Sequence, residues 1–195
     1  MTVYLDANAT TPVDKRVAEV VLTYLTEEYG NAGSRTHEPG HTAKTAVAKA
    51  RQQIGRVVNC DADDVIFTSG ATEANNIALL GLAAEAERTG RRHIVSTAIE
   101  HKAVLEPLER LRTSGFEVEL IAPDRSGRVS AEAVAGATRD DTILVSMMAA
   151  NNETGVVQPV SELCVLLDGH PAYLHVDAAQ ASASFWRICG NLASI

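Results

Sequence analysis

The sequence has 195 residues, of which 46% are hydrophobic and 22% charged, a balance typical of a folded protein rather than a disordered chain. Its net charge of −8 argues against direct binding to nucleic acid, because contact with a phosphate backbone requires clustered lysine and arginine. No apolar run approaches the roughly 20 residues of a membrane span, and the first residues lack a signal-peptide pattern. We therefore expect a cytoplasmic protein with no membrane contact. Its three cysteines lack the paired spacing of a zinc site, so no metal is expected.

Helices and strands are predicted to alternate along the chain. Residues 15–29 and 42–58 show the apolar periodicity of amphipathic helices and flank a loop at 30–37. Short β-branched and aromatic runs predict strands at 65–68, 93–96, 116–121, 142–147 and 173–177. Further helices are predicted directly after residue 72 and at 101–113, 130–137 and 160–167. This alternation predicts an α/β fold with a mainly parallel sheet in three α/β/α layers.

Ligands of such folds bind beyond the carboxyl ends of the strands. That rule selects the polar residues that directly follow predicted strands, which are those at 69–72, 100–101, 151–152 and 177–180.

The segment Ser69-Gly-Ala-Thr72 joins a predicted strand to a predicted helix. Glycine allows a tight turn, and the start of a helix offers unpaired N–H groups and a positive dipole end to an anion. The pattern therefore fits a phosphate cradle. It fits a plain strand-to-helix turn equally well, and the residues alone leave both interpretations open.

Asp177 ends an apolar predicted strand, where a carboxylate needs a cationic partner or serves as a helix cap. His101 follows another strand and could stack on an aromatic ring or transfer protons, although a single histidine at this position is more often a helix-start residue. The polar run at 151–155 could bind a ligand or simply form a turn. Each signal is weak by itself.

Taken together, six segments resemble the cysteine desulfurases, which are fold-type I enzymes dependent on pyridoxal 5′-phosphate (PLP) and related to class V aminotransferases. They occur in the family's order and cover residues 1 to about 180. The segments are Leu5-Asp-Ala-Asn-Ala-Thr-Thr-Pro12, Gly30-Asn31, Phe67-Thr-Ser-Gly-Ala-Thr-Glu73, Glu100-His-Lys-Ala-Val-Leu105, Asn151-Asn-Glu-Thr-Gly-Val-Val-Gln158 and His175-Val-Asp-Ala-Ala-Gln180. The 30–35 loop and the last segment are most similar to desulfurases that supply sulfur for DNA phosphorothioation.

The resemblance implies a reaction and a set of binding residues. The family converts L-cysteine to alanine and leaves a persulfide on an enzyme cysteine. Ala71 and Thr72 would hold the PLP phosphate, and His101 would stack on the pyridine ring and act catalytically in proton transfer. Selenocysteine lyase is an alternative activity within the same family.

Three further residues receive roles from the same resemblance. Asn152 would contact cofactor or substrate, Asp177 would pair with the pyridine nitrogen, and Gln180 would hydrogen-bond the ring hydroxyl. The family also implies a homodimer or an association with an intact desulfurase.

The resemblance stops before the strand that carries the family's Schiff-base lysine. We therefore expect residues 1–180 to form a partial PLP-binding large domain and 181–195 to be a tail unlike the family, which a one-base frameshift after Gln180 would explain. The four lysines all lie upstream, and none of the three cysteines matches the family's catalytic cysteine. The chain alone is expected to be inactive. Alternatively, it is half of an enzyme completed by a second chain, or a scaffold that dimerises with an intact desulfurase.

Overall fold

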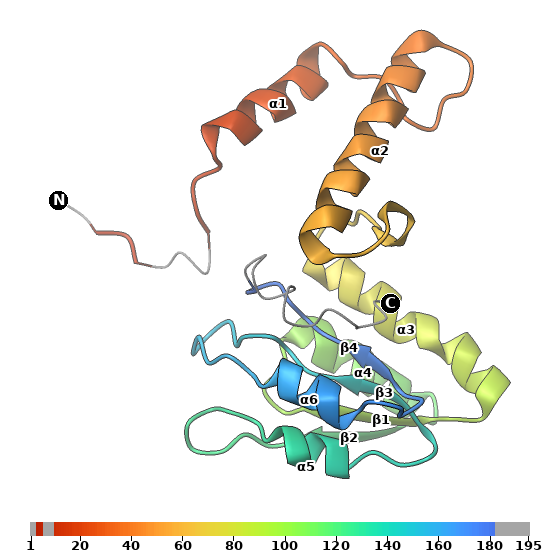
Figure 1. Cartoon of the computed structure of the whole chain (residues 1–195), viewed down its shortest axis with the longest axis vertical. Coiled ribbons are helices and arrows are strands. Elements are labelled where there is room, and N and C mark those ends of the chain that lie inside the picture. The colour runs from red at the N-terminus through yellow and green to blue at the C-terminus, as the bar shows by residue number, and fades with distance from the viewer. Residues whose placement is uncertain (1–2, 6–9, 182–195) are drawn as a thin grey trace. The chain divides into compact units, whose positions relative to one another are not determined.

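The structure is a computed structural model that describes residues 3–5 and 10–181 (Figure 1). The predicted tail at 181–195 lies outside the described residues except for Ala181. The chain divides into two compact units, Met1–Ile66 and Phe67–Ile195. Within the described part, no helix is both long enough and apolar enough to cross a bilayer.

The first unit is helical. Helix α1 (Lys15–Thr26) begins where the Asp14 carboxylate accepts the backbone N–H of Arg16 at 2.9 Å. Helix α2 (Glu38–Val58) begins earlier than predicted because His37 caps it, its Nδ1 accepting the Gly40 amide at 3.1 Å. Proline 39 is compatible with a first helical turn, where its missing N–H has no acceptor to lose. The short 3₁₀ helix η1 (Ala62–Asp64) follows.

Helix α1 presents its apolar face to solvent. The predicted apolar residues are between 50% and 72% exposed, and no residue of the helix is buried. They are Val17, Val20, Val21, Leu22 and Leu25. The amphipathic pattern thus predicted the helix, but the structure places no core against it.

The second unit is built around a parallel sheet. Its elements are α3 (Ala71–Thr89), β1 (His93–Thr97), α4 (Lys102–Thr113), β2 (Glu117–Ile121), α5 (Ala131–Gly136), β3 (Thr142–Ser146), α6 (Val160–Leu166) and β4 (Tyr173–His175). The strand order is β2-β1-β3-β4, and every neighbouring pair is parallel.

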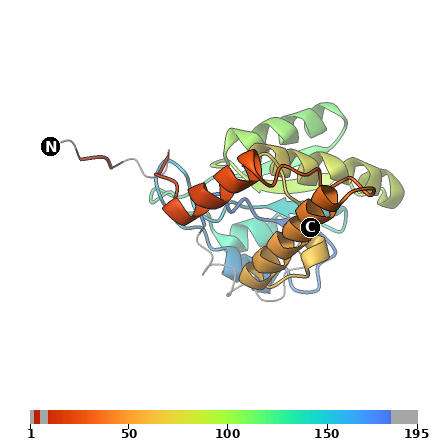
Figure 2. The ribbon, with the colours of Figure 1, turned by 90° about the horizontal axis from the view of Figure 1, so that it is seen from above.

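Helices cover both faces of this sheet, as Figures 1 and 2 show. On one face, α3 and α4 pack Leu79 and Leu108 against Ile94 of β1. On the other face, α5 and α6 pack Val134 and Leu163 in the cluster that contains the next β1 residue, Val95. Adjacent strand residues point to opposite faces, so β1 and β3 are buried throughout. The three-layer α/β/α prediction is confirmed.

The predicted strand at 65–68 is absent, and that prediction was wrong. Val65 is buried, but Ile66 is 69% exposed and Phe67 49% exposed. A β-strand forms only where a neighbouring strand accepts its backbone hydrogen bonds, and no strand of the described sheet pairs with this run. Residues 65–68 therefore do not form a strand, although their side chains favour one.

Candidate functional site

The direction of the sheet connections reverses between β1 and β3. The chain passes from β1 outward to β2 and then returns to the other side of β1 to form β3. The carboxyl ends of two such strands border a crevice where ligands of open α/β sheets bind. Two hydrogen bonds join the segments that follow these strands. The Met148 amide donates to Glu100 Oε1 at 2.8 Å, and Asn151 Nδ2 donates to the Ile99 carbonyl at 3.0 Å.

Glu100 is a buried carboxyl group at this point, with only 5% of its surface exposed. Its Oε1 accepts from Thr97 Oγ1 at 2.6 Å and from the Met148 amide, whereas Oε2 has no partner in the described part of the chain. Burial raises the pKa of Glu100 to about 7, against the opposing effect of those two hydrogen bonds. Near neutral pH both the protonated and the ionised form of Glu100 are therefore populated.

The start of α3 confirms that 69–72 leads into a helix. Gly70 is the N-cap residue, and the Glu73 carboxylate turns back to accept the Ser69 amide at 2.6 Å, which lowers the pKa of Glu73. The amides of Ala71 and Thr72 belong to the first turn, so they have no acceptor within the helix. Both residues are exposed, and they can donate to an anion together with the Thr72 hydroxyl.

His101 caps α4. Its Nδ1 accepts the Ala103 amide at 3.1 Å, and its side chain is exposed. The bond fixes the ring at the helix start, and a neutral His101 consequently carries its proton on Nε2. The helix-start role and a role in ligand binding are thus compatible.

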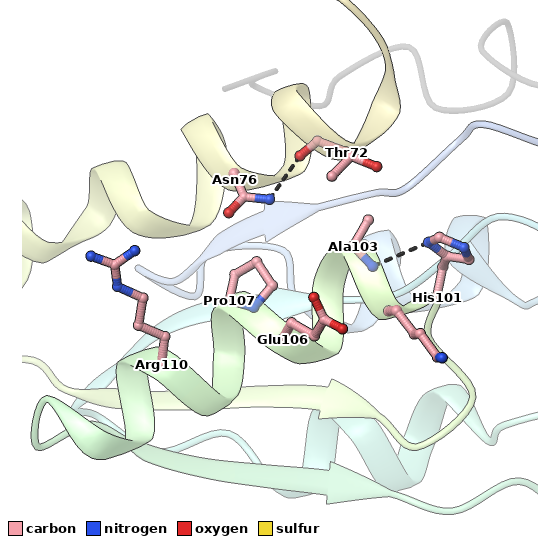
Figure 3. Close-up of a pocket in the computed structure, with 8 residues that line it drawn as sticks. Thr72, Asn76, His101, Ala103, Glu106, Pro107 and Arg110 are labelled. Atoms are coloured by element: carbon pink, nitrogen blue, oxygen red, sulfur yellow. Dashed lines mark hydrogen bonds between the residues drawn. The ribbon is translucent and has the colours of Figure 1, made fainter.

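A pocket of about 280 Å³ lies between the N-terminal part of α3 and α4. Figure 3 shows seven of its lining residues with labels. The pocket is lined by Thr72, Asn76, His101, Lys102, Ala103, Glu106, Pro107 and Arg110. Two of the predicted site residues, Thr72 and His101, therefore meet there. The other lining residues were not predicted as site residues: Asn76 lies on α3, and the remaining five lie within 102–110 of α4.

The remaining predicted residues lie outside the pocket lining. Asp177 is buried and lies two residues after β4, which ends before the predicted strand does, and its carbonyl accepts the Ala149 amide at 2.8 Å. Gln180 is exposed in the turn after it, and Asn152 is half-buried in the loop after β3. The neighbouring Asn151 organises that loop, since its Oδ1 accepts the amides of Glu153 and Thr154.

Asp177 is held by partners on two elements. Its Oδ1 accepts the Ala179 amide at 3.0 Å, and its Oδ2 accepts from Asn75 Nδ2 of α3 at 2.8 Å. Asn75 Oδ1 lies 3.1 Å from His175 Nε2, and His175 Nδ1 lies 2.8 Å from Ser146 Oγ. Sequence reasoning missed this row of side chains. One signal was present: Asn75 is a polar residue on the helix stripe that continues with Leu79, Leu82 and Ala86, all of them buried.

The donor set fits PLP, which carries a phosphate at one end and a pyridine nitrogen at the other. The first turn of α3 supplies donors for an anion, and the Asp177 carboxylate supplies an acceptor for a protonated ring nitrogen. The two ends are connected directly, because Asn75, which bonds Asp177, lies one helical turn after Thr72. Among the described residues, no group of three potential ligands could hold a metal ion.

Comparison with known proteins places the chain in one family. Residues 3–185 match the aminotransferase class-V family. The cysteine desulfurase IscS of Methylococcus capsulatus is 46% identical over 180 residues, which cover 92% of this chain and 44% of that protein. The match to the family extends a few residues past Gln180, where the tail was predicted to begin.

Two solved structures have the same fold at substantial identity. DndA from Streptomyces lividans is 58% identical with a TM-score of 0.85, over 96% of this chain and 52% of that one. SspA, solved in complex with cysteine, is 35% identical with a TM-score of 0.86, over 92% of this chain and 51% of that one. The chain thus spans about half the length of the relatives that it matches.

Proposed function

Because the chain belongs to the aminotransferase class-V family, we propose that it forms the cofactor-binding part of a PLP-dependent cysteine desulfurase. The observation that carries this proposal is the 2.8 Å hydrogen bond between Asn75 and Asp177. It links the helix start suited to a phosphate with the buried carboxylate suited to a pyridine nitrogen. Cysteine desulfurases and class V aminotransferases use PLP, and one cofactor occupying both ends accounts for the arrangement.

Each end of the site would contribute in a distinct way. The amides of Ala71 and Thr72 and the Thr72 hydroxyl would bind the phosphate, assisted by the positive end of the α3 dipole. His101, oriented by its bond to the Ala103 amide, would cover one face of the pyridine ring and hold a proton at Nε2. Asp177 would accept the N–H of the pyridine nitrogen. Bound PLP supplies an electron sink for breaking bonds of an amino acid substrate.

The two remaining residues would act at the rim of this site. Asn152, in the loop after β3, would contact cofactor or substrate, and Gln180 would donate to the ring hydroxyl. The pocket beside His101 is lined by Lys102 and Arg110 and by a single acid, Glu106, so its charge balance favours an anionic group.

The proposed substrate is L-cysteine. The reaction breaks the carbon–sulfur bond, transfers the sulfur to an enzyme cysteine as a persulfide and releases alanine. Support comes from the relatives: the protein from Methylococcus capsulatus is a cysteine desulfurase, and the related SspA was solved with cysteine. The complete reaction is proposed for the whole protein, because the chain covers about half of each relative.

The test is a titration of the chain with PLP followed by absorbance. We expect Thr72→Val and Asp177→Ala each to weaken binding about tenfold or more, since each removes a hydrogen bond to a charged group, worth roughly 1.5–3 kcal/mol. Thr138→Val is the matched control, because Thr138 lies just after α5 and donates to the Ala135 carbonyl away from the site. Equal affinities for all four proteins would contradict the proposal.

A further inference from the structure

The hydrogen bonds around Asp177 have a defined direction. An ionised carboxylate only accepts, so Asn75 must present its NH₂ group to Asp177, as the 2.8 Å contact from Nδ2 shows. The Oδ1 of the same amide then faces His175 Nε2 at 3.1 Å. Because Oδ1 can only accept, the proton of the imidazole sits on Nε2.

The direction continues through the imidazole. Burial lowers the pKa of His175, and the opposing charge of Asp177 is the smaller effect, so the ring is neutral at neutral pH. With its proton on Nε2, the ring accepts at Nδ1, and the Ser146 hydroxyl 2.8 Å away donates to it. Three hydrogen bonds thus point one way, from Ser146 through His175 and Asn75 to the carboxylate.

A proton on Oδ2 of Asp177, the oxygen that faces Asn75, would reverse the whole row. Its hydroxyl would donate to the Asn75 oxygen, which turns the amide NH₂ toward His175. Nε2 would then have to accept, the imidazole proton would move to Nδ1, and Ser146 would receive it. The tautomer of His175 therefore reports whether Asp177 is held as an acceptor.

We propose that Asn75 is a positioning residue that presents the Asp177 carboxylate to the pyridine nitrogen of PLP, and that His175 and Ser146 fix the orientation of the Asn75 amide. Asn75 and the Ala179 amide hold one carboxylate oxygen each, which limits rotation of the group. The contacts that connect Asn75 to Asp177 and to His175 span 102 and 100 residues of sequence, so they fasten α3 to the end of β4. The proposal rests on the proposed role of Asp177.

The first measurement needs no cofactor. In a chain labelled with ¹⁵N-histidine, long-range ¹⁵N–¹H correlation distinguishes the two neutral tautomers, and the His175 signal is assigned by its loss in His175→Gln. We expect protonated Nε2 and unprotonated Nδ1 for His175 in the unmodified chain, and a mixture of tautomers in Asn75→Ala. A proton on Nδ1 in the unmodified chain would overturn the proposal.

The second measurement compares PLP with its 1-deaza analogue, in which carbon replaces the pyridine nitrogen. We expect the unmodified chain to bind PLP about tenfold more tightly or better, since only PLP makes the charge-assisted bond to Asp177. Asn75→Ala should bring the ratio of the two affinities to within about threefold of one. Leu79→Ala, one turn further along the same buried helix stripe, controls for lost packing and should keep the ratio.

A pair of His175 variants tests the inference if Asn75→Ala does not fold. His175→Gln retains a donor near the position of Nε2 and should keep the preference for PLP, whereas His175→Leu removes the donor and should reduce it. A preference that persists in Asn75→Ala, or is equal in both His175 variants, would refute the positioning role alone. Equal binding of PLP and the analogue by the unmodified chain would instead refute the proposed role of Asp177.

Discussion

At the residue scale, Glu100 couples protonation to folding. Its folded-state pKa, about 7, lies above the value of 4.5 of an unperturbed glutamate, so the folded chain binds more protons than the unfolded chain between these values. The contribution of Glu100 to the free energy of unfolding is greatest below pH 4.5 and declines as the pH rises to about 7. At about 1.4 kcal/mol per pKa unit, the decline is on the order of 3 kcal/mol.

Glu100→Gln tests this coupling. The amide oxygen can accept from Thr97 and the Met148 amide as Oε1 does, but the side chain no longer titrates. The free energy of unfolding is measured with urea at pH 5, 6 and 7. It should decrease less with rising pH in the variant than in the unmodified chain. Parallel pH profiles for the two proteins would show that Glu100 does not titrate in this range.

Single residues could be chosen as candidates where their place in the chain was informative. Asp177 and His101 stand at the carboxyl ends of predicted strands, which made them candidates, and their expected roles came from the family resemblance. Asn75 and His175 act through each other across 100 residues of sequence, and no local pattern encodes that contact. Gln158 was part of a recognised segment, but it is buried with its Oε1 accepting the Val129 amide, a structural bond between two loops.

At the scale of elements, the sequence predicted the existence of every helix of the described chain longer than three residues, although it gave no end for α3, and it predicted the four strands of the described sheet to within two residues. Capping fixes the start of α5, because Ser130, the first residue of the predicted helix, accepts the Ala133 amide at 3.1 Å as its N-cap. The strand prediction at 65–68 was wrong because a strand needs a neighbouring strand to pair with, and the local sequence does not show whether one is present.

Helix α1 and the central strands should differ widely in hydrogen exchange. No residue of α1 is buried, whereas β1 and β3 are buried at every position. Helices without tertiary packing open easily, so peptides from residues 15–26 should exchange at least about a thousandfold faster than those from 93–97 and 142–146. Mass spectrometry resolves these peptides. Slow exchange of 15–26 would show that its apolar face is covered in solution.

At the scale of the whole molecule, the positions of the lysines determine whether the chain can bind PLP covalently. All four precede Asp177 in sequence, and only Lys102 lines the pocket that contains Thr72 and His101. Lys102 belongs to the first turn of α4, not to a segment after the Asp177 strand, where the family resemblance places the Schiff-base lysine. We therefore expect these 195 residues to bind PLP without a covalent bond.

Borohydride reduction followed by peptide mapping measures this. The expected result is no stoichiometric pyridoxyl group at any of the four lysines after incubation with PLP. Lys102→Arg serves as the control for background labelling in the pocket, since it retains the charge without a reactive amine. Stoichiometric modification of Lys102 that is lost in this variant would contradict the expectation.

The two edge strands of the sheet differ, so the addition of another strand should favour one edge over the other. At β2, the Arg139 guanidinium pairs with the Glu117 carboxylate at 2.8 Å, and the Arg112 guanidinium donates to the Val118 carbonyl at 3.1 Å. Strand β4 has the half-buried, uncharged Tyr173 and Leu174, and no described strand lies beyond it. A further strand would meet charged side chains and an occupied backbone acceptor at β2 but an uncharged margin at β4, so we expect it to pair more easily at β4. If copies of this chain associate incorrectly through their sheets, we expect the contact to form at the β4 edge.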